Sequence, residues 1–567
     1  MTPTIVAGRR GLMVRWAPSA YALALTLAIT APLLAPGYLL FRDAVSTPRS
    51  YLSDSAIGLG ESAPRAVPQD FAIAMLSAFI DGGVVVKAVL FTGVFLAGWG
   101  AARLTAQLLP DADVPGQLVA TTVAIWNPYV AERLLQGQWS LLLAYGTLPW
   151  VAAAMVRLRN GPAGHSDWAA AVLWIALAGL TPTGLMLAAI VALVCIAGPG
   201  AGFSRIRCGA AVLVIAVLAA LPWLTASALG SGLSGSQTAG LAPFSARAEP
   251  SLGTLGSLAG LGGIWNAEAV PHSRTTVFAL VATIVLLAVV ACGIPTLLRR
   301  PAAEPLLILA AVSVLLVAAM ATGPGLTVLR AVVDAIPGLA VLRDGQKWVA
   351  LAMPGYALSG AGAVLMLRRW IRPGISAALC AAALIAVLPD LAWGVGGSIG
   401  PVHYPDGWAA VAAKINSDPR DVAVLPPETM RRFAWAGSAP VLDPLPRWVR
   451  ASVLSTGDLV VSGRTVTGEG TRAHEVQRLL SAGADRATLA AAGVGWVVGE
   501  TGAQSLKQLP IDYSDDDLTL YRVGGMSPVV PQWKREAVIA AHFIWAGMIL
   551  TGAAVLAFSA RRRRAGS

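Results

Sequence analysis

A carboxylate lies just beyond the end of the first long apolar run, in the stretch PGYLLFRDAV that begins at Pro36. Asp43 falls where the surface of a membrane is expected, and a carboxylate there costs free energy unless it is paired or functional. Two interpretations follow from the residues alone. The side chain of Asp43 either takes part in catalysis, or it ends the helix in headgroup water with Arg42 as its partner.

Two cations follow much later in the chain, in the stretch LRDGQKW. Arg343 and Lys347 are four residues apart, and Trp348 follows them at the start of an apolar run. Arg suits a lipid phosphate through its forked donors, and Lys suits it as a point charge. The alternative is an ordinary pair that snorkels to the membrane surface beside an aromatic belt. The topology below places both on the outer side, where basic residues are unusual, and this favours phosphate binding.

A third polar segment, WNPYVAERLLQGQW, is dense in side chains that bind sugars. We expect Gln138 and Trp139 to face the hydroxyls and the ring of a sugar. Glu132 either belongs to the same site or pairs with Arg133. His272, in WNAEAVPHS, is a further candidate, although a single His in a loop is more often solvated.

Composition decides the class of protein that carries these residues. Of the 567 residues, 56% are hydrophobic and only 13% are charged, whereas a soluble protein has about 25% charged residues. Apolar runs of about 20 residues, long enough to cross a bilayer, recur along the chain. The first run is too long, and lacks the small-residue cleavage site, of a signal peptide. The sequence therefore predicts a polytopic α-helical membrane protein.

The basic residues indicate the orientation of the helices, because Lys and Arg accumulate in cytoplasmic loops. We expect about twelve spans, with both chain ends inside. They are near residues 18–40, 84–104, 115–128, 139–156, 167–181, 184–199, 209–229, 276–297, 304–321, 348–366, 374–394 and 537–558. Because the basic clusters lie in the short loops between spans, the net charge of +11 is not the signature of a nucleic-acid-binding protein.

The chain divides into three parts. Residues 1–395 form the membrane bundle, with outer loops at 41–83, 230–275 and 322–347, and residues 535–567 form a last span with a basic tail. Between them, residues 396–534 are predicted to be an extracytoplasmic α/β domain. Its segments WAAVAAKI, AHEVQRLLSAG and RATLAAAG have helical patterns, and DVAVLP, VGWVVGE and LTLYRV have strand patterns. In this domain, PLPRWVR offers Trp448 either for stacking on a polysaccharide or as a brace for the bundle.

The sequence lacks the motifs of several common kinds of site. The four cysteines lie in or next to predicted spans, which indicates neither a disulfide framework nor a metal site. The chain has no Walker loop, CxxC, HExxH or GxSxG motif, and no GxGxxG between a strand and a helix. An ATP-driven transporter or a membrane metalloprotease is therefore disfavoured.

The topology and three segments resemble the GT-C superfamily of integral membrane glycosyltransferases. The chain has a cytoplasmic N-terminus, a first span and a long outer loop that begins with an acid in LLFRDAV. The segments NPYVAERLLQGQWSLLLAYGTLPW and PGLAVLRDGQKW are similar to actinobacterial members, which include arabinofuranosyl- and mannosyltransferases of the cell envelope. The topological likeness covers nearly the whole chain, and the likeness in residues is confined to those segments.

The resemblance implies transfer of a sugar, arabinofuranose or mannose, from a polyprenyl-phosphate donor to a glycan or glycolipid of the envelope outside the cytoplasmic membrane. The family's acid corresponds to Asp43, which would be the general base, while Arg343 and Lys347 would stabilise the leaving phosphate. Many members have two adjacent acids, but Ala44 follows here. A divalent metal cofactor and a second carboxylate therefore stay open.

Two other functions stay open. One is a scaffold that kept the bundle but lost activity, which the missing second acid would explain. The other is a transporter of lipids or solutes, which about twelve spans would suit. Carriers usually have two related halves and polar residues in interrupted spans, and the sequence has no repeat of that kind.

Overall fold

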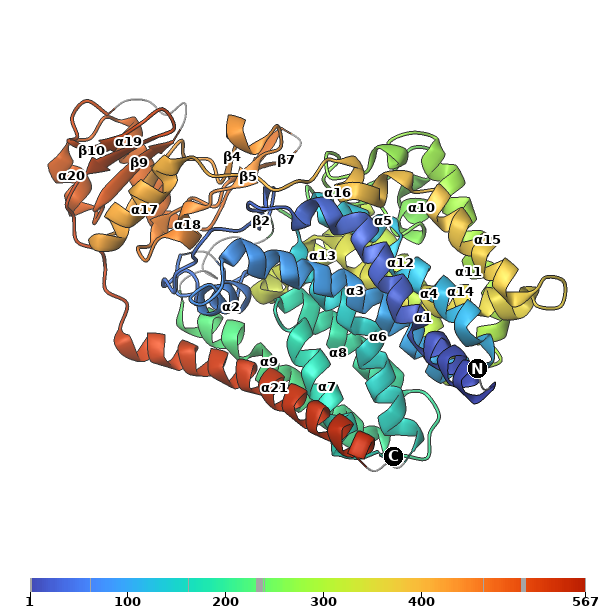
Figure 1. Cartoon of the computed structure of the whole chain (residues 1–567). Helices are drawn as coiled ribbons and strands as arrows, with labels where there is room; N and C mark the ends of the chain where they lie inside the picture. Colours follow the sequence, from blue (N-terminus) through green and yellow to red (C-terminus); the bar gives the residue numbers. More distant parts are fainter. Residues whose placement is uncertain are drawn as a thin grey trace.

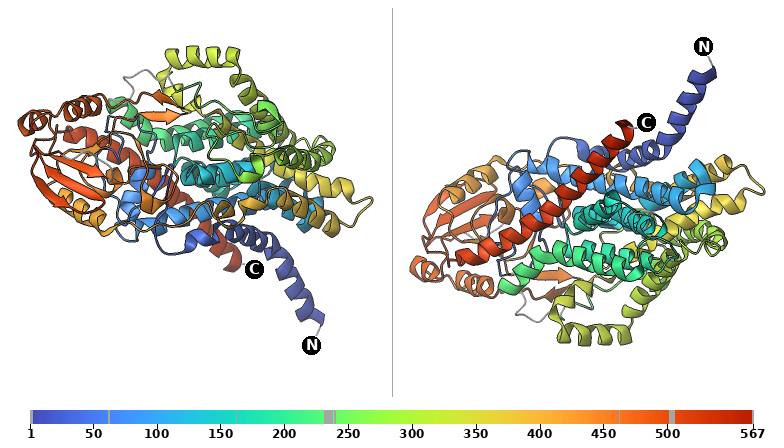
Figure 2. Two further views of the ribbon diagram at one scale, coloured as in Figure 1. Left: turned by 90° about the horizontal axis from the view of Figure 1, so that it is seen from above. Right: turned by 90° about the horizontal axis from the view of Figure 1, so that it is seen from below.

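The computed structural model describes residues 3–61, 63–161, 163–230, 238, 240–461, 463–500 and 506–565. Its helices pack into one elongated bundle, and a region with β-sheets lies at one end of it (Figure 1). Both ends of the chain lie toward the opposite end of the bundle (Figures 1 and 2). The last helix, α21 (Gln532–Ala565), runs along the side of the bundle from the β-sheet region toward that end.

In the described part of the chain, seven helices are long and apolar enough to cross a membrane. They are Trp16–Leu34 in α1 (Pro3–Thr30) and η1 (Ala31–Leu34), α3 (Gly82–Leu108), α6 (Trp139–Asn160), α9 (Arg205–Leu229), α11 (Phe278–Leu297), Gly345–Leu367 in η5 (Gly345–Ala352) and α14 (Met353–Leu367), and Gln532–Arg562 in α21. Two bent pairs raise the number to nine if each is one span. By length and composition these are the helices of a polytopic membrane protein.

The bent pairs break at short interruptions. Helix α12 (Glu304–Met320) turns by 92° into α13 (Gly323–Ala335), and α15 (Pro373–Ala386) turns by 74° into the segment Pro389–Gly396. Thr322 caps α13 by accepting a hydrogen bond from the backbone of Gly325, so the new helix begins where the old one stops.

The prediction of twelve spans is not confirmed, because three expected spans form short helices. These are α4 (Asp113–Ile125), α7 (His165–Ala178) and α8 (Pro182–Ile196), with 13, 14 and 15 residues. A helix of 15 residues is about 22 Å long, whereas the apolar core of a bilayer is about 30 Å thick. The helices that follow α4 and α7 each begin with a proline, Pro128 or Pro182. The side chain of the residue before it, Asn127 or Thr181, caps the new helix.

The C-terminal region has the predicted α/β elements. A five-stranded sheet has the order β10-β11-β9-β3-β6, in which β3 (Val422–Leu425) pairs in parallel with both β6 (Val453–Leu454) and β9 (Trp496–Glu500). Strands β10 (Ile511–Ser514) and β11 (Leu518–Arg522) complete the sheet in antiparallel pairs. Its helices include α17 (Asp406–Ser417), α19 (Thr471–Ser481) and α20 (Arg486–Ala491). The helices and strands expected from the sequence are confirmed here.

The first loop, residues 41–83, is folded onto this region. Its hairpin of β1 (Leu40–Phe41) and β2 (Ala44–Val45) borders β5 (Val441–Leu442), where the backbone N–H of Arg42 donates to Pro440 at 3.1 Å and that of Leu442 donates to Arg42 at 2.9 Å. The loop also contains a short helix, α2 (Gln69–Leu76), and Asp81 caps α3. The hairpin thus bridges the bundle and the sheets.

Gly137 gives the closest approach between the hairpin and the bundle. It lies between α5 (Pro128–Leu135) and α6 with a φ of +79°, and an added Cβ atom would lie 2.4 Å from both the Ala44 nitrogen and the Phe41 oxygen. Only glycine adopts this conformation easily, and only glycine leaves room for the hairpin.

We predict that Gly137→Ala lowers the free energy of unfolding by about 1–3 kcal/mol, because the strained φ and the clash add. Gly161→Ala is the control, since no described heavy atom lies within 4 Å of its added Cβ. Thermal unfolding of the detergent-purified protein measures both. Equal midpoints for the two variants would contradict the close approach.

Candidate active site around Asp43

Asp43 is at the tip of the β1–β2 hairpin, and the link between α5 and α6 holds it there. Its backbone N–H donates to the carbonyl of Gln136 at 3.1 Å, and Gln138 Nε2 donates to its Oδ2 at 3.0 Å. The carboxylate is half-buried. Arg42 is not its partner, which corrects one expectation: its guanidinium donates to Glu268 Oε2 at 3.2 Å and to the Glu268 carbonyl at 3.0 Å.

A continuous chain of polar contacts leads from Asp43 to Lys347. Gln138 Oε1 accepts a hydrogen bond from Arg133 Nη1 at 2.8 Å. The Arg133 guanidinium forks onto both oxygens of Asp344, at 2.9 and 3.1 Å. Lys347 Nζ lies 3.6 Å from Asp344 Oδ2. The polar segment before α6 and the stretch LRDGQKW therefore form one site.

Arg343 precedes Asp344 in the chain and lies within electrostatic range of it. Its guanidinium carbon lies 4.4 Å from the centre of the Phe244 ring. Burial first, and the nearby Arg65 second, lower the pKa of Arg343 to about 10, while acidic neighbours that include Asp43 oppose this shift. Lys347 also lies within electrostatic range of Asp43. Both cations singled out in the sequence therefore lie within electrostatic range of Asp43, and Arg343 stays charged at neutral pH.

Glu132 is completely buried next to this site, which it contacts through Gln346. Its two oxygens accept hydrogen bonds from the backbone N–H groups of Gly263 and Ile264, both at 3.1 Å, and Oε2 also accepts one from Gln346 at 3.0 Å. Burial, and then the charge of Glu249, raise the pKa of Glu132 well above its usual value. Glu132 thus anchors the loop after α10 (Gly253–Ala259). The expected pairing of Glu132 with Arg133 is wrong, because Arg133 pairs with Asp344.

The other two predicted sugar-binding residues lie apart from the polar chain. Trp139 is buried among apolar side chains of the bundle. His272 is exposed at the start of η3 (His272–Arg274), where the next residue, Ser273, donates from its N–H and hydroxyl to Asp390 at 2.7 and 2.6 Å. Neither side chain takes part in the contacts that link Asp43 to Lys347.

An apolar cavity lies against the strands on both sides of Asp43. Its volume is about 20 Å³. It is lined by Leu33, Leu39, Phe41, Ala44, Leu90, Leu134, Gly137, Trp139 and Ile399. The hairpin therefore has a polar neighbourhood at its tip and an apolar one along its strands.

Sequence reasoning missed Asp344 and Gln346, although both stand in the quoted stretch LRDGQKW. An acid between two cations indicates a local pair, and nothing local indicates Arg133, which is 211 residues away. It also missed Arg65, whose charge acts on Arg343 and which forms an ion pair with Glu469. That contact joins the first loop to the C-terminal region.

The described residues do not fit a protein-held divalent metal ion. Among them, no group of three or more His, Cys, Asp or Glu side chains is arranged to hold one. The neighbours of Asp43 are an amide and cations rather than further acids.

Comparison with protein-family models and with curated proteins finds no match to this chain. The resemblance to the GT-C superfamily stays a prediction that rests on the segments quoted above.

We predict that Arg133→Met lowers the free energy of unfolding by about 3–5 kcal/mol, since the buried Asp344 carboxylate loses both of its hydrogen bonds from Arg133 and keeps the longer contact with Lys347, at 3.6 Å. The side chains of Arg133 and Asp344 are 0% and 6% exposed. The double variant Arg133→Met/Asp344→Leu should recover part of the loss, as measured by thermal unfolding.

The control is Arg157→Met, which breaks an ion pair whose side chains are 43% and 19% exposed. It should cost less than about 1 kcal/mol. A loss for Arg133→Met no larger than that of the control would contradict the role of the buried pair.

Proposed function

We propose that the chain is a GT-C-like membrane glycosyltransferase that transfers arabinofuranose or mannose from a polyprenyl-phosphate donor to an envelope glycan or glycolipid. The observation that carries the proposal is the chain of polar contacts that links the half-buried Asp43 carboxylate, through Gln138, Arg133 and Asp344, to Lys347, with Arg343 next to Asp344 in the chain. An enzyme of this kind needs a base for a hydroxyl and positive charge for a phosphate.

In the proposed reaction, Asp43 accepts the proton of an acceptor hydroxyl while the oxygen of that hydroxyl bonds to the anomeric carbon of the donor sugar. The bond from that carbon to the phosphate oxygen breaks, and the polyprenyl phosphate leaves with the electron pair. Arg343 and Lys347 stabilise the negative charge that develops on the leaving oxygen. A single displacement of this kind inverts the configuration at the anomeric carbon.

Gln138 orients the base for this step. Its amide occupies Asp43 Oδ2, and no hydrogen bond between described residues engages Oδ1. Oδ1 is therefore the atom that would receive the proton. Because Gln138 is itself held by Arg133 at 2.8 Å, the carboxylate is positioned by a buried ion pair rather than by solvent.

The proposed location is the bacterial cytoplasmic membrane, with the site and the α/β region outside the cytoplasm. In support, both chain ends lie away from the α/β region (Figure 1).

A non-catalytic scaffold is the second candidate function. The apolar cavity beside Asp43 is only about 20 Å³, room for about one water-sized group. A polyprenyl chain would need the lining side chains to move apart, whereas a scaffold needs no such change.

We predict that Asp43→Asn lowers transfer by about 10²–10⁴-fold, because it removes the general base. The assay uses purified protein, a radiolabelled polyprenyl-phosphate sugar and an oligosaccharide acceptor. Lys347→Met and Arg343→Met should lower transfer as well, through the loss of charge stabilisation.

Asp111→Asn is the control, an acid of η2 (Pro110–Ala112) that is 51% exposed. It should transfer at the wild-type rate. Undiminished transfer by Asp43→Asn would remove this residue from the mechanism. An intact wild-type protein that transfers no sugar from any donor would favour the scaffold or a transporter.

A further inference from the structure

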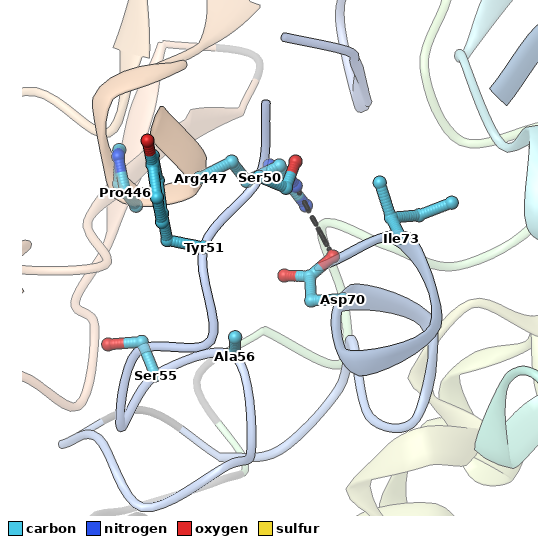
Figure 3. A pocket seen from close by; sticks show the side chains of 8 residues that line it. All are labelled: Ser50, Tyr51, Ser55, Ala56, Asp70, Ile73, Pro446 and Arg447. Atoms are coloured by element: carbon cyan, nitrogen blue, oxygen red, sulfur yellow. Dashed lines mark hydrogen bonds and ion pairs between the residues drawn. The ribbon is translucent and has the colours of Figure 1, made fainter. Parts of the chain in front are cut away.

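A second cavity lies between the first loop and α18 (Leu445–Trp448) of the C-terminal region. Its volume is about 50 Å³, and Figure 3 shows its lining. Tyr51 and Ser55 come from the first loop, Asp70 from α2, and Pro446 and Arg447 from α18. None of these residues belongs to the site around Asp43.

One wall of this cavity is an ion pair with a free acceptor. Arg447 Nη2 and Nε lie 3.2 and 3.3 Å from Asp70 Oδ1. No hydrogen bond between described residues engages Asp70 Oδ2, and in Figure 3 the second carboxylate oxygen points toward the cavity. Within the lining, the charges of Asp70 and Arg447 cancel, and Oδ2 of Asp70 remains as an acceptor for a hydroxyl.

The other wall is an aromatic ring that is held in place. The backbone N–H of Tyr51 donates to the Arg447 carbonyl at 3.0 Å. The guanidinium carbons of Arg49 and Arg450 lie 5.1 and 5.0 Å from the ring centre. The fixed ring loses little conformational entropy when a ligand binds.

We propose that this cavity binds one ring of a neutral saccharide. The C–H groups of the sugar would lie against the Tyr51 side chain where it lines the cavity, and its hydroxyls would donate to Asp70 Oδ2 and bond to Ser55. An aromatic wall that faces a few polar groups, among them a carboxylate oxygen without a partner among the described residues, suits a polyhydroxylated ligand.

The residue that the sequence indicated for stacking does not face this cavity. Trp448 is 7% exposed, and its ring packs against Trp408 and Tyr404 in the core of the C-terminal region. The preceding residue, Arg447, lines the cavity instead, and its carbonyl accepts the hydrogen bond from Tyr51.

The cavity and Asp43 share two backbone segments. Tyr51 follows Asp43 by eight residues, which span at most about 29 Å. Arg447 follows Leu442, the residue that bonds the Asp43 hairpin, by five residues. Given the proposed function, one long acceptor glycan would occupy the cavity while its end lies at Asp43.

The binding test uses full-length protein in detergent and linear hexasaccharides of mannose and of arabinofuranose, followed by saturation-transfer NMR and calorimetry. Tyr51→Ala should weaken binding of the preferred hexasaccharide by about tenfold, whereas Tyr51→Phe keeps the ring and the affinity. Asp70→Asn tests the polar wall and should also weaken binding. Unfolding midpoints check that each variant is folded.

The transfer test separates this inference from the proposed function. Tyr51→Ala should raise KM for a hexasaccharide acceptor and leave transfer to a disaccharide unchanged. If the wild type transfers but Tyr51→Ala handles both acceptors like the wild type, the cavity is not an acceptor site and the proposed function stands. If the wild type binds hexasaccharide through Tyr51 but transfers nothing, the saccharide site stands and the proposed function fails.

Two further outcomes would overturn the inference. One is a wild-type protein that binds neither hexasaccharide. The other is binding of inorganic phosphate that Tyr51→Ala and Asp70→Asn change while hexasaccharide binding stays the same, which would make the cavity an anion site.

Discussion

The buried ion pair between Arg133 and Asp344 is the constraint on which the candidate active site depends. Two charges removed from water are tolerated only when they meet in good geometry, and here they form a fork with contacts of 2.9 and 3.1 Å. The pair ties α5 to the segment before α14. Gln138 accepts a hydrogen bond from Arg133 and donates one to Asp43, and Lys347 lies beside Asp344. A catalytic base and a phosphate site would thus be placed by one contact.

The C-terminal region contributes to the same arrangement from the other side. The hairpin that carries Asp43 is bonded through Arg42 to Pro440 and Leu442, so its tip cannot move independently of those residues. The first loop is likewise tied down through Arg65, which pairs with Glu469. A site held on packed elements keeps its geometry better than one on a free loop. The α/β region is therefore part of the support for Asp43 as well as a place for a second site.

Much of the architecture could be predicted because it depends on local patterns. Hydrophobic runs and periodicity predicted the long membrane helices and the elements of the C-terminal sheet. Two of the three short helices, α4 and α7, differ because Pro128 and Pro182, each with a capping side chain before it, begin a new helix early. Composition reveals the apolar run but not where packing will end the helix.

The candidate site was predicted only in part, because partners of buried charges are set by tertiary contacts. Asp43, Gln138, Arg343 and Lys347 were found from residue type and position, but Arg133 and Asp344 are far apart in sequence. Adjacency misled twice, since neither Arg42 with Asp43 nor Glu132 with Arg133 forms a pair. A tryptophan such as Trp139 or Trp448 can stack on a sugar or pack in a hydrophobic core, and the sequence does not distinguish these roles. In the structure both side chains are buried.

The central claim is that Asp43 and the two cations surround one phosphate-bearing sugar donor. The most direct measurement is a cryo-electron microscopy structure of the protein in lipid with a polyprenyl phosphate bound. We expect the phosphate within hydrogen-bond distance of Arg343 and Lys347, with the Asp43 carboxylate facing it and still held by Gln138. A phosphate bound elsewhere, or an Asp43 side chain turned away into solvent, would contradict the account.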